Sequence, residues 1–183
     1  MARLPETLQA GPVELRRWRL EHLDALIDAV TTSLPELSVW MPWAKETPRR
    51  DEYGTVLTGF EASFDAGTEF VYGMFESGSD VVGGCGLHLR GAPVVVEVGY
   101  WVRTDRQRRG YATAAARALT TAAFEHLHGV DEVHITMDEA NAASARVPSK
   151  LRYRLHTEEE REVLAPGHTG RGFRWVVERA TWP

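Results

Sequence analysis

Three strand-like segments joined by short turns, then a long helix leading to a fourth strand, constrain the fold of this chain most strongly. The three segments are Glu69–Glu76, Val81–Leu89 and Val94–Val102, and turns this short join antiparallel strands. Gly110–Leu127 is alanine-rich and predicts a helix, and Glu132–Asp138 predicts the next strand. A strand, a long helix and a strand form a crossover connection, which favours a parallel pair. The sequence therefore predicts a mixed, mostly antiparallel sheet.

The remaining segments indicate an α+β arrangement in which helices flank this sheet. Apolar residues recur at steps of three and four in Glu21–Val30 and in Arg50–Phe64, which predicts two helices. The segment between them, Ser33–Pro48, contains three prolines and is predicted to be irregular. Other predicted elements are a first strand Val13–Arg19, a short helix Ala142–Leu151 and a closing hairpin of Tyr153–Val163 with Phe173–Arg179. No linker divides the chain, so we expect a single domain over residues 1–183.

Charge and apolar content exclude some classes of protein. The net charge of −5 argues against a nucleic-acid partner, which needs clustered basic residues. No apolar run approaches the roughly 20 residues that span a bilayer, and Met1–Val13 does not resemble a signal peptide. Cys85 is the single cysteine, so no internal disulfide can form. We therefore expect no membrane association and a cytoplasmic location.

The loop and helix start at Gln107–Ala112 combine features of an anion-binding site. A helix N-terminus carries unpaired N–H groups and a partial positive charge, and Gly110 allows a backbone conformation or a close approach that a side chain would obstruct. Four arginines lie nearby, at Arg103, Arg106, Arg108 and Arg109. The alternative is a solvated loop in which Gly110 is only a turn glycine. Neither the Walker A pattern nor G-x-G-x-x-G is present.

The segment Gln107-Arg108-Arg109-Gly110-Tyr111-Ala112 resembles the coenzyme A signature [RQ]-x-x-G-x-[GA] of the GCN5-related N-acetyltransferase (GNAT) superfamily. Gly99-Tyr100-Trp101-Val102, Asn141-Ala142-Ala143-Ser144 and Trp40-Met41-Pro42-Trp43-Ala44 resemble its RimJ/RimL-like branch, which acetylates protein N-termini and other amines. The resemblance covers residues 12–182. It implies a GNAT fold with a central, splayed parallel strand pair, acetyl-CoA as co-substrate and an amine as acceptor.

The resemblance also implies a role for each matching residue. Backbone amides from Arg108 to Thr113 would hold the pyrophosphate of coenzyme A, and the strand edge at Tyr100–Val102 would pair with the pantetheine arm. Asn141 would hydrogen-bond the pantetheine region, and Ser144 would lie near the thioester sulfur. The cofactor-binding residues implied are Tyr100, Trp101, Val102, Gln107, Arg108, Arg109, Gly110, Tyr111, Ala112, Thr113, Asn141 and Ser144.

Two catalytic residues are predicted, Glu97 and Ser144. Family members often carry a general-base glutamate in the strand that contains Glu97, where it could take a proton from the amine. The alternatives are that Glu97 faces solvent or pairs with an arginine, and Asp138 and Glu139 are reserve candidates. Ser144 would assist the leaving thiolate, although it could instead cap the short helix.

Two positions depart from the family pattern. Many members use a tyrosine seven residues after the motif asparagine, but this chain has Pro148 there. A proline inside the helix loses a backbone bond and crowds the carbonyl of Ser144, so we predict a kink or a late helix start. Arg152 stands where glycine is usual, which predicts a strained turn. These departures keep open a non-catalytic coenzyme A-binding module of the same fold.

The other chemically active residues do not suggest a second kind of site. The seven histidines show no spacing typical of zinc, so no metal is predicted, and nothing identifies a base partner for Cys85. Trp40, Trp43 and Phe60 could line an acceptor pocket or pack in the core. The acceptor itself, a peptide α-amine, an amino-sugar or another small amine, is not specified by the sequence, and a homodimer is left open.

Overall fold

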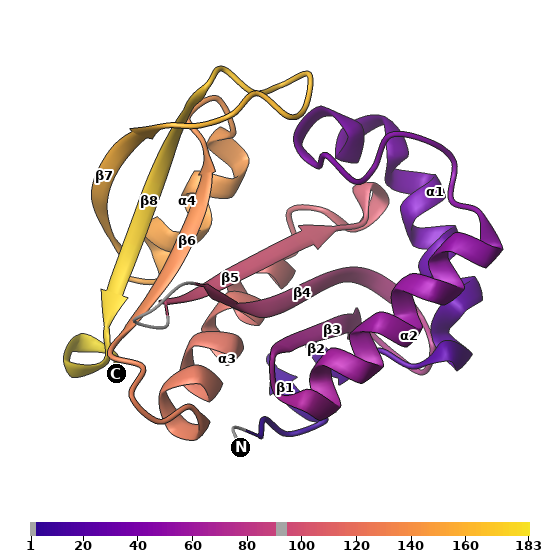
Figure 1. The fold of residues 1–183 in the computed structure, drawn as a ribbon, viewed down its shortest axis with the longest axis horizontal. Helices are drawn as coiled ribbons and strands as arrows, with labels where there is room; N and C mark the ends of the chain where they lie inside the picture. The colour runs from indigo at the N-terminus through magenta and orange to yellow at the C-terminus, as the bar shows by residue number, and fades with distance from the viewer. Residues whose placement is uncertain (1–2, 91–94) are drawn as a thin grey trace.

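The computed structural model describes residues 3–90 and 95–183. Its eight strands form one sheet in the order β1-β2-β3-β4-β5-β6-β8-β7 (Figure 1). The strands are β1 Thr7–Ala10, β2 Val13–Arg17, β3 Glu69–Phe75, β4 Val81–Arg90, β5 Val95–Val102, β6 Glu132–Asp138, β7 Arg154–Glu160 and β8 Arg171–Glu178. The α-helices are α1 Leu23–Trp40, α2 Arg50–Ala66, α3 Tyr111–His126 and α4 Ala142–Lys150.

The predicted antiparallel meander is confirmed. Strands β3, β4 and β5 pair in sequence order, and His88 of β4 lies opposite Glu97 of β5. Most of the turn predicted at Arg90–Pro93, together with Val94, lies outside the described residues. The closing hairpin is also confirmed, and β8 is inserted between β6 and β7.

The parallel strand pair is splayed, as the family resemblance implied. Among the described residues, strands β5 and β6 pair at Val96–Val133 and Glu97–His134 alone, with α3 as the crossover between them. Beyond Glu97, β5 continues along β4 while β6 continues along β8, so the two strands diverge (Figure 1). This divergence opens the middle of the sheet.

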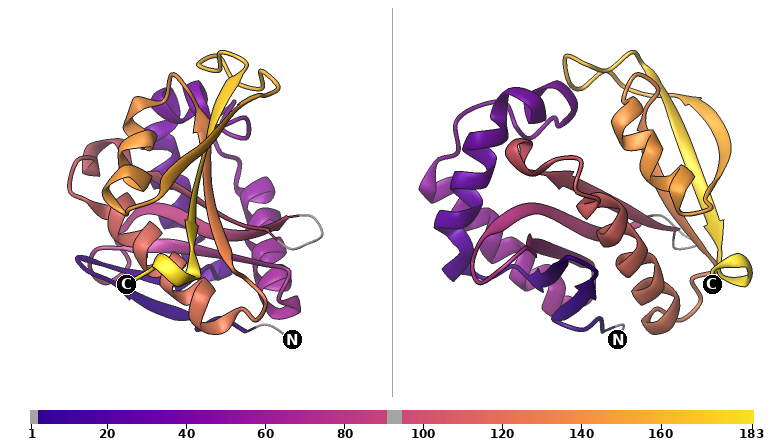
Figure 2. Two further views of the ribbon diagram at one scale, coloured as in Figure 1. Left: turned by 90° about the vertical axis from the view of Figure 1, so that its left-hand side faces the viewer. Right: turned by 180° about the vertical axis from the view of Figure 1, so that it is seen from behind.

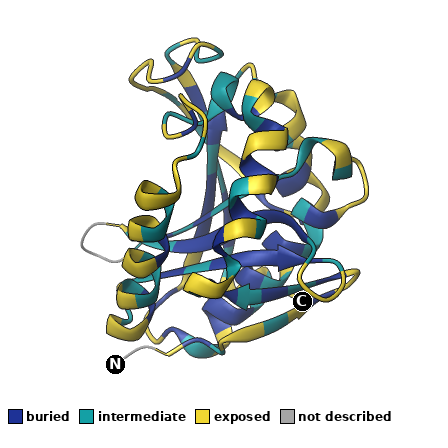
Figure 3. Cartoon of the chain, turned by 90° about the vertical axis from the view of Figure 1, so that its right-hand side faces the viewer, coloured by how far each residue is buried: buried dark blue, intermediate teal, exposed yellow. Residues whose placement is uncertain are grey.

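Helices cover both faces of the sheet and leave that opening accessible. Helices α1 and α2 lie on one face, and α3 and α4 lie on the other (Figure 2). The inner side of α3 consists mainly of small residues, including Ala115, Ala116 and Ala123, which lets the helix approach β4 and β5 closely. Buried residues concentrate in the strands and along the inner sides of the helices (Figure 3). No helix in the described part of the chain is long and apolar enough to cross a membrane.

The prediction that Ser33–Pro48 is irregular is wrong over its first eight residues. Helix α1 continues through Pro35 and ends at Trp40. Ser33 and Leu37 are buried and continue the inner face that begins at Leu23, so packing outweighs the roughly 3 kcal/mol that an interior proline costs. Strand β1, a four-residue strand paired with β2, was not predicted from the sequence.

Helix α4 begins at Ala142, as the boundary was predicted, but it remains helical through Pro148. The predicted late start is therefore wrong. The hydroxyl of Tyr100 on β5 donates a 3.1 Å hydrogen bond to the carbonyl of Ser144, which Pro148 leaves without its donor within the helix. The strained turn after this helix is confirmed, because Arg152 has φ 63°, in the left-handed region.

Candidate active site

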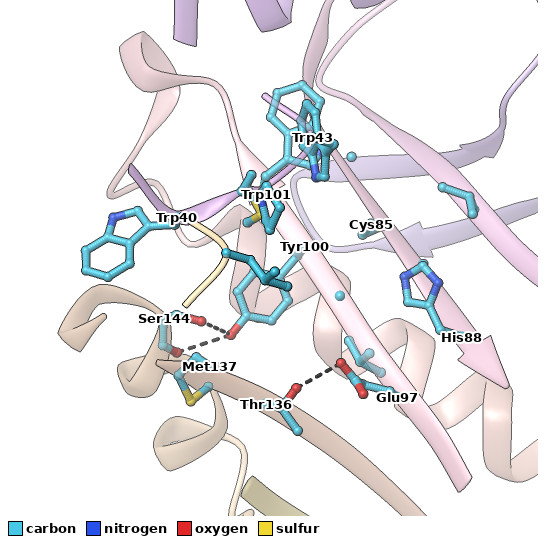
Figure 4. Close-up of a pocket in the computed structure, with 18 of the residues that line it drawn as sticks. Trp40, Trp43, Cys85, His88, Glu97, Tyr100, Trp101, Thr136, Met137 and Ser144 are labelled. Carbon is cyan, nitrogen blue, oxygen red and sulfur yellow. Dashed lines mark hydrogen bonds between the residues drawn. The ribbon is translucent and has the colours of Figure 1, made fainter. Parts of the chain in front are cut away.

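A cavity of about 1120 Å³ lies where β5 and β6 diverge. Its walls come from β4, β5 and β6, from the C-terminal end of α1 and from the start of α4 (Figure 4). Glu97, Tyr100, Thr136 and Ser144 all line it. The cavity thus brings together side chains from both sides of the splayed strand pair.

Glu97 projects toward the opening between the strands. Its side chain is half-buried, and the hydroxyl of Thr136 on β6 donates a hydrogen bond of 2.8 Å to its Oε1 (Figure 4). Glu97 forms no ion pair with an arginine in the described residues, so neither alternative, solvent exposure or an arginine partner, describes its position. A carboxylate held in a cavity by a single hydrogen bond retains lone pairs that can accept a proton.

The two reserve candidates are engaged with other groups. The carboxylate of Asp138 accepts hydrogen bonds from the backbone N–H groups of Ala140 (2.9 Å) and Thr169 (2.8 Å). Burial acts to raise the pKa of Asp138, but these hydrogen bonds outweigh it and hold the pKa below its ordinary value. Glu139 lies 3.6 Å from the guanidinium of Arg171. Glu97 is therefore the better placed proton acceptor.

Ser144 does not cap α4. The cap is Asn141, whose Oδ1 accepts a 3.1 Å hydrogen bond from the backbone N–H of Ser144. The Ser144 hydroxyl instead lies 3.1 Å from the phenol oxygen of Tyr100. The cap uses one lone pair of the Asn141 side-chain oxygen, and the amide nitrogen remains as a donor for a bond to pantetheine.

The start of α3 has the geometry predicted for an anion site. Gly110 has φ 85°, and a Cβ at this position would meet nothing within 4 Å, so the backbone conformation and not space requires glycine. No side chain among residues 3–90 and 95–183 caps the helix. The first backbone hydrogen bond runs from the N–H of Ala114 to the carbonyl of Gly110, which leaves the amides of Tyr111, Ala112 and Thr113 available.

Most of the neighbouring arginines are already paired. Arg103 contacts Asp28 and Asp105, Arg106 contacts Asp80, and Arg109 lies 3.5 Å from Glu76. Arg108 forms no ion pair within the described part of the chain, is exposed and has φ 62°. The predicted cationic cluster therefore reduces to Arg108 as the cation most available to a phosphate. Gln107 beside it is exposed.

The outer part of β5 presents a backbone edge. Residues Tyr100, Trp101 and Val102 pair with β4 on one side only, because the pairing with β6 ends at Glu97. The edge that faces the opening therefore has N–H and C=O groups without a strand partner in the described structure, as pairing with a pantetheine arm requires.

Aromatic side chains form the other end of the cavity. Trp40, Trp43 and Phe60 line it, together with Trp101, and the Trp43 and Trp101 rings meet edge-on with centroids 6.2 Å apart. Trp43 is half exposed, so these residues form a wall and not only core packing. The acceptor-pocket interpretation of the three aromatics is therefore favoured.

A second polar pair, His88 with Glu69, lies at this cavity and was not predicted from the sequence. His88 lines the cavity opposite Glu97, and its Nδ1 lies 2.5 Å from Oε1 of Glu69 on the neighbouring strand. The two residues are 19 positions apart, so only the register of β3 and β4 reveals their contact. The alternation of side chains along β4, counted back from the turn predicted after Leu89, was the sequence signal that could have placed His88 on this face of the sheet.

Two other chemistries find little support in the described residues. Cys85 is buried, and its burial raises the pKa of the thiol, so it is not a thiolate at neutral pH. No group of three or more histidine, cysteine, aspartate or glutamate side chains within residues 3–90 and 95–183 could hold a metal ion.

Comparison with known proteins identifies the family. Residues 13–154 match the family model described as an acetyltransferase (GNAT) domain. A Bacillus subtilis protein named "Putative ribosomal N-acetyltransferase YdaF" is 29% identical over 136 residues, which cover 72% of this chain and 73% of that protein.

Solved structures agree in fold. A RimL ribosomal L7/L12 alpha-N-protein acetyltransferase in complex with coenzyme A has a TM-score of 0.85 at 18% identity, covering 94% of this chain and 98% of RimL. Mycobacterium smegmatis RimJ in complex with a coenzyme A disulfide has a TM-score of 0.84 at 19% identity, covering 97% of this chain and 88% of the RimJ chain. The splayed strand pair, the uncapped helix start and the family match lead to one conclusion: this chain belongs to the GNAT family of acetyltransferases, with a RimJ/RimL-like fold.

Proposed function

We propose that this protein transfers an acetyl group from acetyl-CoA directly to a primary amine, with a peptide or protein N-terminus as the principal acceptor class. The observation that carries the proposal is the cavity at the splayed strands. It places Glu97 on β5 and Ser144 on α4 around one opening, next to an unpaired strand edge. Acetyl-CoA supplies the activated thioester, and the protein supplies position and proton handling.

The residues on the α3 side of the opening and those in the cavity have different proposed roles. On the α3 side, the free amides after Gly110 and the cation of Arg108 would hold the pyrophosphate, and the edge of β5 would align the pantetheine. In the cavity, Glu97 would accept the proton of the attacking amine. Ser144 would donate a hydrogen bond to the departing sulfur.

The acceptor side supports a cationic amine. Its wall of tryptophans offers ring faces that attract an ammonium group. Glu52, Glu159 and Glu160 also line the cavity, which makes its charge acidic even with Arg161 beside them. The YdaF relative is named a ribosomal N-acetyltransferase, and RimL is named an alpha-N-protein acetyltransferase of ribosomal L7/L12. These two names support a peptide α-amine over a small amine. We include a cytoplasmic location in the proposal, because acetyl-CoA and a free thiol at Cys85 suit a reducing compartment.

Replacement of Glu97 by glutamine tests the proton-transfer step. The substitution keeps the size and the hydrogen bond from Thr136 but removes the base, so we expect kcat to fall by about 10²-fold with little change in acetyl-CoA affinity. Glu178→Gln is the matched control, since Glu178 lies on β8 in an exposed pair with Arg154. Unchanged activity of Glu97→Gln at every pH would remove Glu97 as the base.

One observation favours a second candidate, a non-catalytic coenzyme A-binding module. Pro148 occupies the position of the tyrosine that assists the thiolate in many relatives. Turnover across a panel of peptide, amino-sugar and small amines separates the two candidates. Coenzyme A binding without thiol release for any acceptor would support the module and contradict the enzyme.

A further inference from the structure

Pro148 creates a hydrogen-bonding deficit inside α4. In an uninterrupted helix the carbonyl of Ser144 accepts a bond from the N–H four residues later, but position 148 is proline and has no N–H. Pro148 is also buried, so water does not reach this turn from the side of the proline ring. A partner from outside the helix is needed if the turn is to keep its shape.

Tyr100 supplies that partner. Its hydroxyl donates to the carbonyl oxygen of Ser144 at 3.1 Å, and the same phenol oxygen lies 3.1 Å from Oγ of Ser144 (Figure 4). Tyr100 comes from β5, on the opposite side of the opening from α4. One phenol therefore contacts both the main chain and the side chain of Ser144.

The Tyr100 and Ser144 hydroxyls carry one hydrogen each, which limits how the two groups can bond. A phenol has one hydrogen, so when Tyr100 donates to the Ser144 carbonyl, the Ser144 hydroxyl donates to the phenol oxygen. When Tyr100 turns its hydrogen to Oγ, the Ser144 hydrogen becomes available to another acceptor. The Ser144 hydroxyl is free to take part in either state, because Asn141 and not Ser144 caps the helix.

We propose that Tyr100 is a positioning residue: in the resting protein its hydrogen replaces the backbone hydrogen bond lost at Pro148, and during transfer that hydrogen turns to Oγ, which leaves the Ser144 hydroxyl free to donate to the departing thiolate. The inference rests on the proposed acetyl transfer. In that step the N–C bond forms, the C–S bond breaks, and the electron pair stays on sulfur. The Ser144 hydroxyl then donates a hydrogen bond to the sulfur while Tyr100 donates to Oγ.

Tyr100 acts in this arrangement as a hydrogen-bond donor and keeps its proton. Burial raises the pKa of Tyr100 to about 12, and the hydrogen bond with Ser144 offsets this only in part. The phenol thus stays protonated throughout the working pH range. The sulfur of the product receives its proton from solvent, and the side chains supply orientation and hydrogen bonds.

Tyr100→Phe tests the proposal because it removes one oxygen and keeps the ring. We expect kcat to fall about 10-fold while the KM for acetyl-CoA stays within about 2-fold, since loss of one buried hydrogen bond is worth roughly 1.4 kcal/mol. Tyr153→Phe is the matched control. Its hydroxyl is also buried and bonds Thr120 at 2.6 Å, outside the cavity, so kcat should stay within about 2-fold.

Rescue distinguishes positioning from simple packing. Pro148→Ala restores an N–H that can bond the Ser144 carbonyl, so the double variant Y100F/P148A should regain about 3-fold of the lost kcat. Amide hydrogen exchange over residues 142–148 should be faster in Y100F than in wild type and slower again in the double variant. If Y100F is too unstable to assay, Y100F/P148A is compared with P148A, and a loss of about 3-fold in kcat is expected.

Three kinetic results would contradict the positioning role of Tyr100. A wild-type kcat in Y100F, or a loss that P148A does not relieve, would overturn the positioning role. So would a kcat in Y100F/P148A equal to that of P148A alone. A wild-type protein without turnover would refute the proposed function instead, and the hydrogen-exchange comparison would still decide whether Tyr100 holds α4.

Discussion

Arg108→Gly should stabilise the unliganded protein and weaken coenzyme A binding at the same time. Arg108 has φ 62°, where a residue with a Cβ is strained by about 1–2 kcal/mol, and glycine removes that strain. Glycine also gains freedom in the unfolded chain, worth roughly 0.5–1 kcal/mol. The net gain is about 0.5–1 kcal/mol, which raises Tm by about 2 °C in a chain of this size.

Loss of the Arg108 guanidinium should weaken the binding of coenzyme A. Arg108 is exposed and unpaired among the described residues, so its contact with a phosphate should contribute about 1 kcal/mol, or a roughly 5-fold change in Kd. Thermal unfolding with and without coenzyme A, together with calorimetric titration, measures both effects. Arg109→Ala is the comparison, because Arg109 already lies near Glu76 and should change Kd less.

Two results would refute this reasoning. A lower Tm for the unliganded Arg108→Gly protein would show that the left-handed conformation is not strained, or that the side chain stabilises the loop. An unchanged Kd would show that Arg108 does not contact the ligand. Arg108→Ala separates the two causes, since it removes the charge and keeps the strain.

Three further predictions concern stability and reactivity. Arg152→Gly should raise the free energy of unfolding by about 0.5–1 kcal/mol in denaturant titration, whereas Arg152→Ala, which keeps φ 63°, should not. Cys85 should resist thiol reagents at pH 8 until the protein unfolds, because it is buried and its pKa is raised; rapid labelling of the native protein would contradict its burial. The pKa of Asp138 is lowered in the folded state, so its contribution is present above the unfolded pKa of about 4 and is lost as pH falls through the folded value; Asp138→Asn should flatten the acid limb of the stability profile, and an unchanged limb would count against it.

The order and direction of the central strands could be predicted, because turn length and crossover length determine how consecutive strands pair. Short turns required β3, β4 and β5 to be antiparallel neighbours, and the long α3 crossover favoured the parallel β5–β6 pair. Helix α1 was predicted too short, because Pro35 was given more weight than the apolar face that continues to Leu37.

The candidate site could be predicted in its residue types but not in its contacts. Glu97 and Ser144 were named from the family pattern, whereas their partners Thr136 and Tyr100 lie 39 and 44 positions away from them in the chain. An even longer separation in sequence, 75 positions, hid the pairing of Arg103 with Asp28. Such contacts depend on strand register and helix placement, which a single sequence does not specify.

The most direct test of the central claim is a product analysis. The protein is incubated with acetyl-CoA and peptides whose N-terminus or lysine side chain alone is free, and the released thiol and the acetylated product are both quantified. We expect one thiol released for each acetylated α-amine, and a loss of about 10²-fold in Glu97→Gln. Bound acetyl-CoA with no acetylated amine, or thiol release equal to that without any acceptor, would contradict the account.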